Sequence, residues 1–158
     1  MKSTFLLFLS LFLTLQISAQ DSDDEWDVTQ HRAETTSVSF ETSEGTWMNL
    51  DVSPDGSEIV FDLMGDIYIM PIDGGDAVLL RGGLAYEIQP RFSPDGSKIS
   101  FTSDAGGGDN IWVMNRDGSD AHQVTEESFR LLNNASWTPD GNYLVARKHF
   151  TSSRSLGA

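Results

Sequence analysis

The sequence predicts an all-β protein, an incomplete β-propeller of four-stranded antiparallel blades with two full blades and half of a third. Three observations predict it. A Ser/Thr-Pro-Asp-Gly turn begins at Ser53 and returns at Ser93 and Thr138, a spacing typical of propeller blades. Apolar residues alternate with polar ones on both sides of each turn, as strands require. No helical periodicity competes with this pattern after residue 20.

The composition excludes several classes of protein. The chain has 158 residues with 24 Asp and Glu against 10 Lys and Arg, a formal net charge of −14. This charge repels phosphates, so we expect no nucleic-acid partner. The absence of cysteine excludes disulfide scaffolds, thiolate metal sites and cysteine nucleophiles. A hydrophobic content of 39% is enough for a packed core.

Residues 1–20 are predicted to be a secretory signal peptide. Lys2 precedes an apolar run from Phe5 to Leu15, small residues follow at Ser18 and Ala19, and acids begin at Asp21. The run is too short to cross a bilayer, so we expect no membrane span after cleavage. The expected localisation is export, to the periplasm or outside the cell.

Residues 21–45 are predicted to be an acidic leader, because their first part has almost no apolar residues to bury. Ser37–Thr42 is the exception, since it alternates polar and apolar residues. We expect it to be a strand placed to close the propeller ring by joining the last blade. In this chain, where that blade is missing, the segment should lie detached.

The repeat begins with a turn that joins the first and second strands of each copy. Proline fixes φ at the second turn position, and Asp-Gly supplies the bend and the left-handed residue. The apolar positions that flank the turns agree between the copies. They are Val52, Phe92 and Trp137 before the turn, then Ile59, Ile99 and Leu144, then Phe61, Phe101 and Ala146.

A second matched block supplies the third and fourth strands. Asp66–Met70 and Asn110–Met114 are nearly continuously apolar, as expected for strands covered on both faces. Shorter outer strands are expected at Ala77–Leu80 and Ala121–Thr125. The third copy stops after its second strand, Tyr143–Lys148. Closed propellers need four to eight blades, so we expect residues 46–158 to be a partial propeller, truncated at the C-terminus, at the front of a longer protein.

These motifs resemble the WD40-like (PD40) repeats of TolB-type propellers. Longer strings resemble the amino-terminal propeller of exported bacterial proteins of the metal-dependent amidohydrolase family; they are Glu44–Val52, Phe61–Tyr68, Arg147–Phe150 and Ser153–Ala158. The resemblance implies a non-catalytic scaffold or interaction propeller followed by a hydrolase domain. It implies that a divalent metal such as zinc belongs to that downstream domain, and that no cofactor belongs to this chain, which lacks the family's His-x-His ligand motif.

Two alternatives remain open. One is a TolB-like periplasmic propeller that binds partner proteins, although TolB-type proteins carry an α/β domain before the propeller. The other is the propeller of a prolyl-oligopeptidase-type serine peptidase. The sequence that follows the propeller distinguishes them, by a His-x-His motif, a Gly-x-Ser-x-Gly motif or no further domain.

No catalytic, cofactor-binding or metal-binding residue is predicted. The three histidines share no ligand spacing and are expected in loops or on the surface; they are His31, His122 and His149. Five residues match EF-hand positions; they are Asp51, Ser53, Asp55, Gly56 and Asp62. We interpret this match as accidental, because Arg91 and Ser136 replace Asp51 in the other copies. A glycosylation sequon at Asn134–Ser136 is also interpreted as accidental.

Loop lengths favour one face of the propeller for binding. The first–second and third–fourth connections share a face and are short and uniform. The other connections vary, and the second copy has the longer Asp104–Asp109 loop, predicted to be a flexible hairpin loop. Variable loops on a rigid scaffold are where binding is usually found. We therefore expect a downstream catalytic domain or a protein partner on the variable-loop face.

Overall fold

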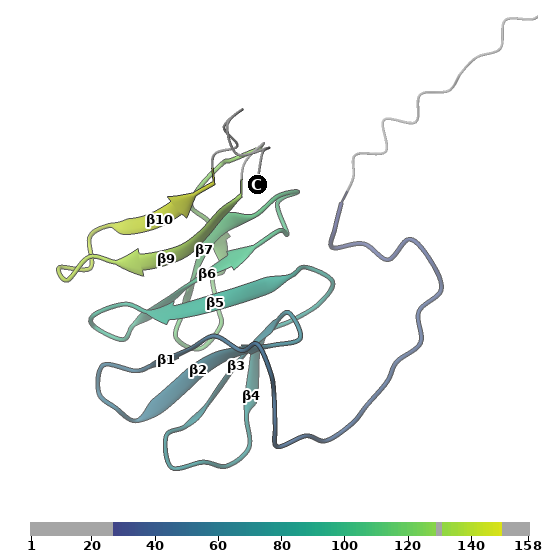
Figure 1. The fold of residues 1–158 in the computed structure, drawn as a ribbon, viewed down its shortest axis with the longest axis horizontal. Helices are drawn as coiled ribbons and strands as arrows, with labels where there is room; N and C mark the ends of the chain where they lie inside the picture. The colour runs from purple at the N-terminus through teal and green to yellow at the C-terminus, as the bar shows by residue number, and fades with distance from the viewer. Residues whose placement is uncertain (1–26, 129–130, 150–158) are drawn as a thin grey trace, which may run out of the picture.

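The computed structural model describes residues 27–128 and 131–149, and this part of the chain consists of β-strands and connecting segments (Figure 1). The signal peptide expected over 1–20 lies outside the described residues. The described strands form antiparallel sheets and no helix, so the predicted all-β propeller class is confirmed.

Two four-stranded sheets form full blades. Blade 1 has the order β1-β2-β3-β4, with β1 at Leu50–Val52, β2 at Glu58–Leu63, β3 at Asp66–Pro71 and β4 at Val78–Arg81. Blade 2 has the order β5-β6-β7-β8, with β5 at Glu87–Phe92, β6 at Lys98–Ser103, β7 at Asn110–Asn115 and β8 at His122–Gln123. A third sheet pairs β9 (Leu132–Trp137) with β10 (Leu144–Lys148). Figure 1 shows the three sheets following one another, with β5 between blade 1 and the β9–β10 pair.

The three Pro-Asp-Gly turns have the same geometry. In each, the glycine N–H donates to the carbonyl of the Ser or Thr at the turn's start, at 2.8 Å. The glycines Gly56, Gly96 and Gly141 have φ of 72°, 71° and 69°. The turn assignment from the sequence is therefore confirmed, since the left-handed position is where glycine is needed.

The hydrophobic core lies between the two full blades. Its buried members come from facing strands; they are Val60, Ile67 and Ile69 of blade 1 and Phe92, Ile99, Phe101 and Met114 of blade 2. Leu80 and Trp112 pack against this cluster. Each blade therefore buries an apolar face only by stacking on its neighbour.

An ion-pair network also joins the blades. Arg116, after β7, donates from Nε to the Glu58 carboxylate of blade 1 at 2.8 Å, and its Nη1 lies 3.3 Å from Asp55. The guanidinium carbon lies 5.6 Å from the Phe92 ring centroid. Arg116 thus contacts blade 1 by charge and blade 2 by its flat face.

The structure differs from the sequence-based expectations at the two outer strands. Ser37–Thr42 lies exposed and outside any sheet, as expected for a ring-closing strand whose partner blade is not among the described strands. An extended segment needs a partner edge to become a strand, and no described strand pairs with it. The outer strand β4 is displaced by one residue relative to Ala77–Leu80, and β8 is shorter than Ala121–Thr125, because both sit at the sheet edge, where few contacts hold them.

Among the described residues, no helix has the length and apolar character needed to cross a membrane.

Candidate functional site

The two ends of the blades differ as the loop lengths predicted. One end carries the Pro-Asp-Gly turns and the Asp-Gly turns after β3 and β7. The other end, the loop face, carries the short Met64–Gly65 turn, the longer Asp104–Asp109 loop and the connections between blades.

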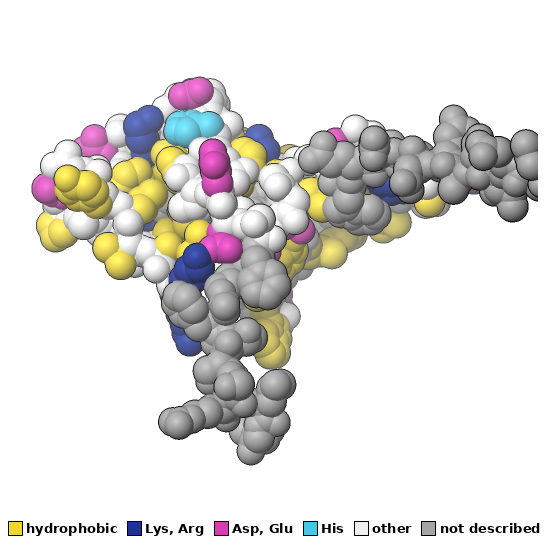
Figure 2. All heavy atoms as spheres, turned by 90° about the horizontal axis from the view of Figure 1, so that it is seen from above, with side chains coloured by type: hydrophobic (Ala, Val, Ile, Leu, Met, Phe, Trp, Pro, Cys, Tyr) yellow, Lys and Arg dark blue, Asp and Glu magenta, His cyan; other side chains and the backbone are white. Residues whose placement is uncertain are grey.

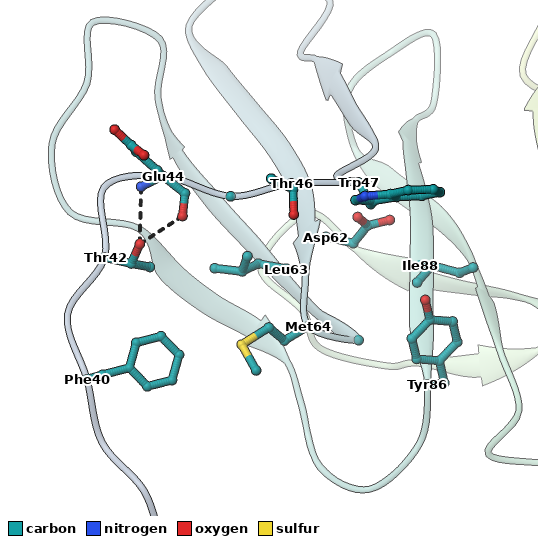
Figure 3. Close-up of a pocket in the computed structure, with 12 residues that line it drawn as sticks. Phe40, Thr42, Glu44, Thr46, Trp47, Asp62, Leu63, Met64, Tyr86 and Ile88 are labelled. Atoms are coloured by element: carbon teal, nitrogen blue, oxygen red, sulfur yellow. Dashed lines mark hydrogen bonds between the residues drawn. The ribbon is translucent and has the colours of Figure 1, made fainter.

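A hollow of about 550 Å³ lies on the loop face between the leader and the first two blades (Figure 3). Its apolar lining comes from three separate segments. These are the leader and the entry to β1 (Phe40, Trp47), the β2–β3 hairpin (Leu63, Met64) and the connection into β5 (Tyr86, Ile88). Figure 3 shows Phe40 on one side of Leu63 and Met64, and Trp47, Tyr86 and Ile88 on the other.

The large side chains at the hollow are exposed to solvent. Trp47 is 99% exposed, Met64 77%, Phe40 59% and Tyr86 57%. Scattered apolar residues are common on protein surfaces, but a gathering around one concavity marks an interaction site. We therefore take this hollow as the candidate site.

Two of these residues also have an unusual backbone. Trp47 has φ of 63° and Met64 has φ of 57°, in the left-handed region that bulky residues rarely adopt. Met64 and Gly65 (φ 88°) form the two-residue connection between β2 and β3, a type I′ turn in which Asn-Gly is the favoured sequence. Bulky side chains at these positions cost conformational energy that their exposed surfaces do not recover within the chain.

Tyr86 is held by contacts with both neighbouring loops. Its backbone N–H donates to the Asp104 carboxylate at 2.7 Å, and the next N–H, of Glu87, donates to the Gly65 carbonyl at 2.8 Å. A Cβ on Gly65 would lie 2.9 Å from the Tyr86 ring, so the close approach requires glycine as well as the positive φ. The hollow is therefore built on a fixed frame.

Asp62 forms the polar floor of the hollow and is only 3% exposed. Its carboxylate accepts hydrogen bonds from the Asn49 backbone N–H and side-chain amide, both at 2.8 Å, and from the Gln89 N–H at 2.7 Å. These bonds tie the entry to β1 and the start of β5 to β2. Asp62 thereby positions the segments that carry Trp47 and Ile88.

The charge around the hollow is negative. Its lining includes the acidic residues Glu44 and Asp62 and no Lys or Arg. The Thr42 hydroxyl donates to the Glu44 carbonyl at 2.8 Å, which holds the leader in the turn drawn in Figure 3. Residues 33–80 of the sequence contain no Lys or Arg at all.

The EF-hand-like residues are not gathered around a common point. Asp51 accepts the Phe92 N–H at 2.9 Å. The Asp62 carboxylate accepts its three hydrogen bonds from Asn49 and Gln89. Asp55 accepts from the hydroxyls of Ser53 and Ser57, both at 2.6 Å, and these bonds hold its pKa well below the usual range. The carboxylates therefore serve the blade contacts and the turn.

The histidines also lie apart. His31 is exposed, His122 hydrogen-bonds through Nδ1 to the Asp120 carbonyl at 2.8 Å, and His149 through Nε2 to the Asn133 side chain at 3.2 Å. Within residues 27–128 and 131–149, no group of three or more His, Asp or Glu side chains is placed to hold a metal.

The Asp104–Asp109 loop makes hydrogen bonds within itself and to β9. Gly107 N–H donates to the Asp104 carbonyl at 2.8 Å, and the Asp109 carbonyl accepts the Leu132 N–H at 3.3 Å. Burial and the neighbouring Asp104 raise the pKa of Asp109. Asn134, in the sequon, has φ of 52° and donates its N–H to Gln89 Oε1 at 2.7 Å, so its backbone is part of a contact between blades.

Sequence reasoning missed Trp47, Met64 and Tyr86 as site residues, because apolar side chains near strands resemble core residues. One signal was present. Methionine precedes glycine in the β2–β3 turn, where a type I′ turn favours Asn or Asp.

Comparisons with known proteins agree with this fold. Residues 47–156 match the family model of the tricorn protease N-terminal beta propeller domain. Tricorn protease homolog 1 of Streptomyces coelicolor is 31% identical over 58% of this chain and 9% of its own length. The uncharacterized protein Atu1656 of Agrobacterium fabrum is 36% identical over 49% of this chain and 28% of its own length. The chain thus spans less than a third of either curated relative.

Solved structures give the same result. A putative TolB from Agrobacterium tumefaciens superposes with a TM-score of 0.62 and 28% identity, over 68% of this chain and 40% of that one. TolB from Acinetobacter baumannii superposes with a TM-score of 0.56 over 65% of this chain and 27% of that one, and at 24% identity it supports the fold alone. The predicted resemblance to TolB-type propellers is confirmed. Because the family model covers more than half of its length, the chain belongs to the family of the tricorn protease N-terminal beta propeller domain.

Proposed function

We propose that this chain is the interaction propeller of an exported protein, which holds a partner on its loop face while catalysis takes place in a separate domain. The observation that carries the proposal is the hollow, where exposed Trp47, Met64 and Tyr86 stand on a rigid frame of stacked blades. Tryptophan, tyrosine and methionine are enriched at protein–protein interfaces, and a rigid scaffold lowers the entropic cost of binding.

The parent protein is proposed to be a hydrolase of the metal-dependent amidohydrolase class. The strings Glu44–Val52 and Phe61–Tyr68 support this, and the family model is named after a protease, which is also a hydrolase. The His-x-His ligands of a metal such as zinc would then belong to the domain after the propeller. The described residues offer no set of donors for that metal, and no catalytic step is assigned to them.

A TolB-like binding protein is the second candidate. The superposition on the putative TolB from Agrobacterium tumefaciens supports it, since the match extends over most of this chain. Reading the coding sequence after residue 158 decides between the parents. An amidohydrolase barrel carries His-x-His, a serine peptidase carries Gly-x-Ser-x-Gly, and a TolB-like protein carries neither.

Export is proposed from residues 1–20. The test is to fuse these residues to alkaline phosphatase lacking its own signal in a bacterial host. We expect active enzyme in the periplasm, and phosphatase that stays inactive in the cytoplasm would contradict the proposal. A fusion with Leu9→Arg is the control that should abolish export, because a charge interrupts the apolar run.

The binding role is tested by photo-crosslinking in cells that produce the full-length gene product. p-Benzoylphenylalanine replaces Tyr86 on the loop face or, as a matched control, the exposed Ile72 on the turn face. We expect protein adducts from position 86 and few from position 72. Adducts confined to position 72 would show that the loop face is not the partner-binding face.

A further inference from the structure

We propose that the hollow binds an extended protein segment in which Lys or Arg alternates with large apolar residues. This inference rests on the proposed function and specifies the partner of the same site.

The apolar part of the partner is indicated by the exposed side chains. Trp47 and Met64 reach the hollow from separate segments and are 99% and 77% exposed. Tyr86 faces the same space from the connection into β5 (Figure 3). An apolar side chain of the partner placed among these three would remove all of them from water at once.

The backbone conformation of Trp47 and Met64 also indicates a binding site. Of the five non-glycine residues with positive φ in the described part of the chain, Trp47 and Met64 are the two bulky apolar ones, and both line the hollow. Strained backbone in a folded protein clusters at ligand-binding positions. Asn or Gly would relieve the strain at either position without loss of burial inside the chain. Binding of a partner therefore explains why a methionine and a tryptophan stand there.

The basic part of the partner is indicated by charge. Glu44 and Asp62 line the hollow, whereas its lining has no cation. The two arginines that follow in sequence are engaged elsewhere. Arg81 Nε donates to Glu87 at 2.8 Å, and Arg91 Nη1 donates to the Pro90 carbonyl at 2.7 Å. A Lys or Arg of the partner would meet the exposed Glu44 and the faces of Trp47 and Tyr86, which attract cations.

The shape favours a protein segment over a small cation. The hollow is lined from three separate segments, and Phe40 and Trp47 belong to opposite ends of it in Figure 3. A single ammonium group would leave most of this apolar lining in water. Alternating basic and apolar side chains of an extended segment reach both kinds of contact.

The space-filling view shows a different surface for comparison. Figure 2 looks onto the molecule from above the β9–β10 pair, where hydrophobic side chains lie beside Lys and Arg. Tyr143, in the turn before β10, and Val145 of β10 are exposed, with Arg147 and Lys148 in the same strand as Val145. This surface shares no residue with the hollow and supplies the control position, Tyr143.

The test uses the full-length gene product and two synthetic peptides. The first, acetyl-Gly-Leu-Lys-Phe-Lys-Leu-Gly-amide, alternates basic and apolar residues, and the second replaces both lysines with glutamates. Titration calorimetry at 50 mM NaCl is expected to show saturable binding of the first peptide only. Raising NaCl to 500 mM should weaken binding several-fold, because salt screens charge attraction at a surface.

Variants locate the binding. Trp47→Ala should weaken binding of the basic peptide at least about tenfold, as truncation of an interface anchor does. Tyr143→Ala should leave this binding unchanged. Met64→Asn should weaken binding several-fold while the protein melts at the same or a higher temperature, because Asn-Gly suits the type I′ turn. This second variant separates loss of binding from loss of folding.

Three outcomes would overturn the inference. They are equal binding of the acidic peptide, equal binding of spermidine or acetyl-lysine amide, and no saturable binding of the basic peptide below about 1 mM, a Kd that corresponds to weak, non-specific contact. If cross-links from position 86 persist in the last case, the loop face still binds a partner and only its chemistry is wrong. If those cross-links are also absent, the proposed function itself is wrong.

Discussion

The Asp62 carboxylate on β2 accepts a hydrogen bond at 2.7 Å from the backbone N–H of Gln89 on β5, and so connects the two full blades. Gln89 has φ of 60° and interrupts the pairing of β5 with β6. One blade further, Gln89 Oε1 accepts the N–H of Asn134, which also has positive φ, at 2.7 Å. First strands of neighbouring blades are not paired with each other, and the side-chain acceptor Gln89 joins two of them, β5 and β9.

Asp62→Asn is expected to destabilise the protein. The buried carboxylate accepts from three N–H groups, and an amide in its place would turn a second donor toward them. The expected loss in the free energy of unfolding is about 2–4 kcal/mol, the cost of an unsatisfied buried polar group with charged hydrogen bonds lost. Urea denaturation measures it. Asp76→Asn, at an exposed position, is the control, and an equal effect of both changes would contradict the assigned role of Asp62.

Met64→Asn is expected to stabilise the protein. Asparagine tolerates the φ of 57° that methionine adopts with strain, and little apolar surface is lost because Met64 is exposed. The gain should be about 1 kcal/mol, within the usual cost of a left-handed residue. Met70→Asn, in the half-buried interior of β3, should instead destabilise. A lower melting temperature for Met64→Asn would show that the turn is not strained by methionine.

Gly118→Ala and Gly74→Ala form a matched pair in the turns after β7 and β3. Both glycines have positive φ, 85° and 92°. A Cβ on Gly118 would lie 2.6 Å from the Leu80 carbonyl oxygen of blade 1, whereas one on Gly74 meets nothing within 4 Å. Gly74→Ala should therefore cost about 1 kcal/mol through backbone strain, and Gly118→Ala about 2–4 kcal/mol, because overpacking between the blades is added. If both substitutions lower the free energy of unfolding equally in chemical denaturation, the close contact between the blades does not add to the effect of Gly118→Ala.

Asp95→Asn should reduce stability at neutral pH and have little effect in strong acid. Hydrogen bonds from the Ser93 hydroxyl, the Ser97 N–H and the Ser97 hydroxyl lower the pKa of Asp95 to about 2. A carboxylate with a lowered pKa in the folded state stabilises above the pKa of the unfolded state, near 4, and this contribution disappears as the pH falls through about 2. Melting temperatures of both proteins at pH 7 and pH 2 test this, and a difference that persists unchanged at pH 2 would contradict it.

Glu87 should show the opposite pH dependence. Burial raises the pKa of Glu87 above its usual value, although the hydrogen bond from Arg81 acts to lower it. Because the folded state holds the proton more tightly, the stability contributed by this group falls as the pH rises from below the unfolded pKa through the folded one. The stability of the wild type relative to Glu87→Gln should therefore decrease between pH 4 and pH 7. An increase over this interval would mean that the ion pair with Arg81 outweighs the burial of the carboxylate.

The strands and turns were largely predictable because each depends on neighbours in the sequence. The alternation around Ile59 and Ile99 and the Asp-Gly dipeptides act over a few residues, so they identify β2, β6 and the turns directly. Ser37–Thr42 alternates as well and forms no strand, since alternation alone does not supply a partner edge.

The candidate site was not predictable in the same way. The loop face was expected to bind from its variable loop lengths, yet Trp47 and Tyr86 come together only when the entry to β1 and the connection into β5 meet across blade 1. Asp62 was considered only as a calcium-like position, whereas the structure gives its carboxylate three N–H donors from two other segments.

The blade repeat follows from the sequence, because turn chemistry and strand periodicity are local properties of the residues. Which of the matched positions are buried depends on the tertiary structure. Val52 and Phe92 occupy the same place in the repeat, yet Val52 is 43% exposed and Phe92 6%. Phe92 lies against blade 1, whereas no described blade lies on the equivalent face of blade 1. Burial depends on which surfaces stack, and stacking joins residues that are distant in the sequence.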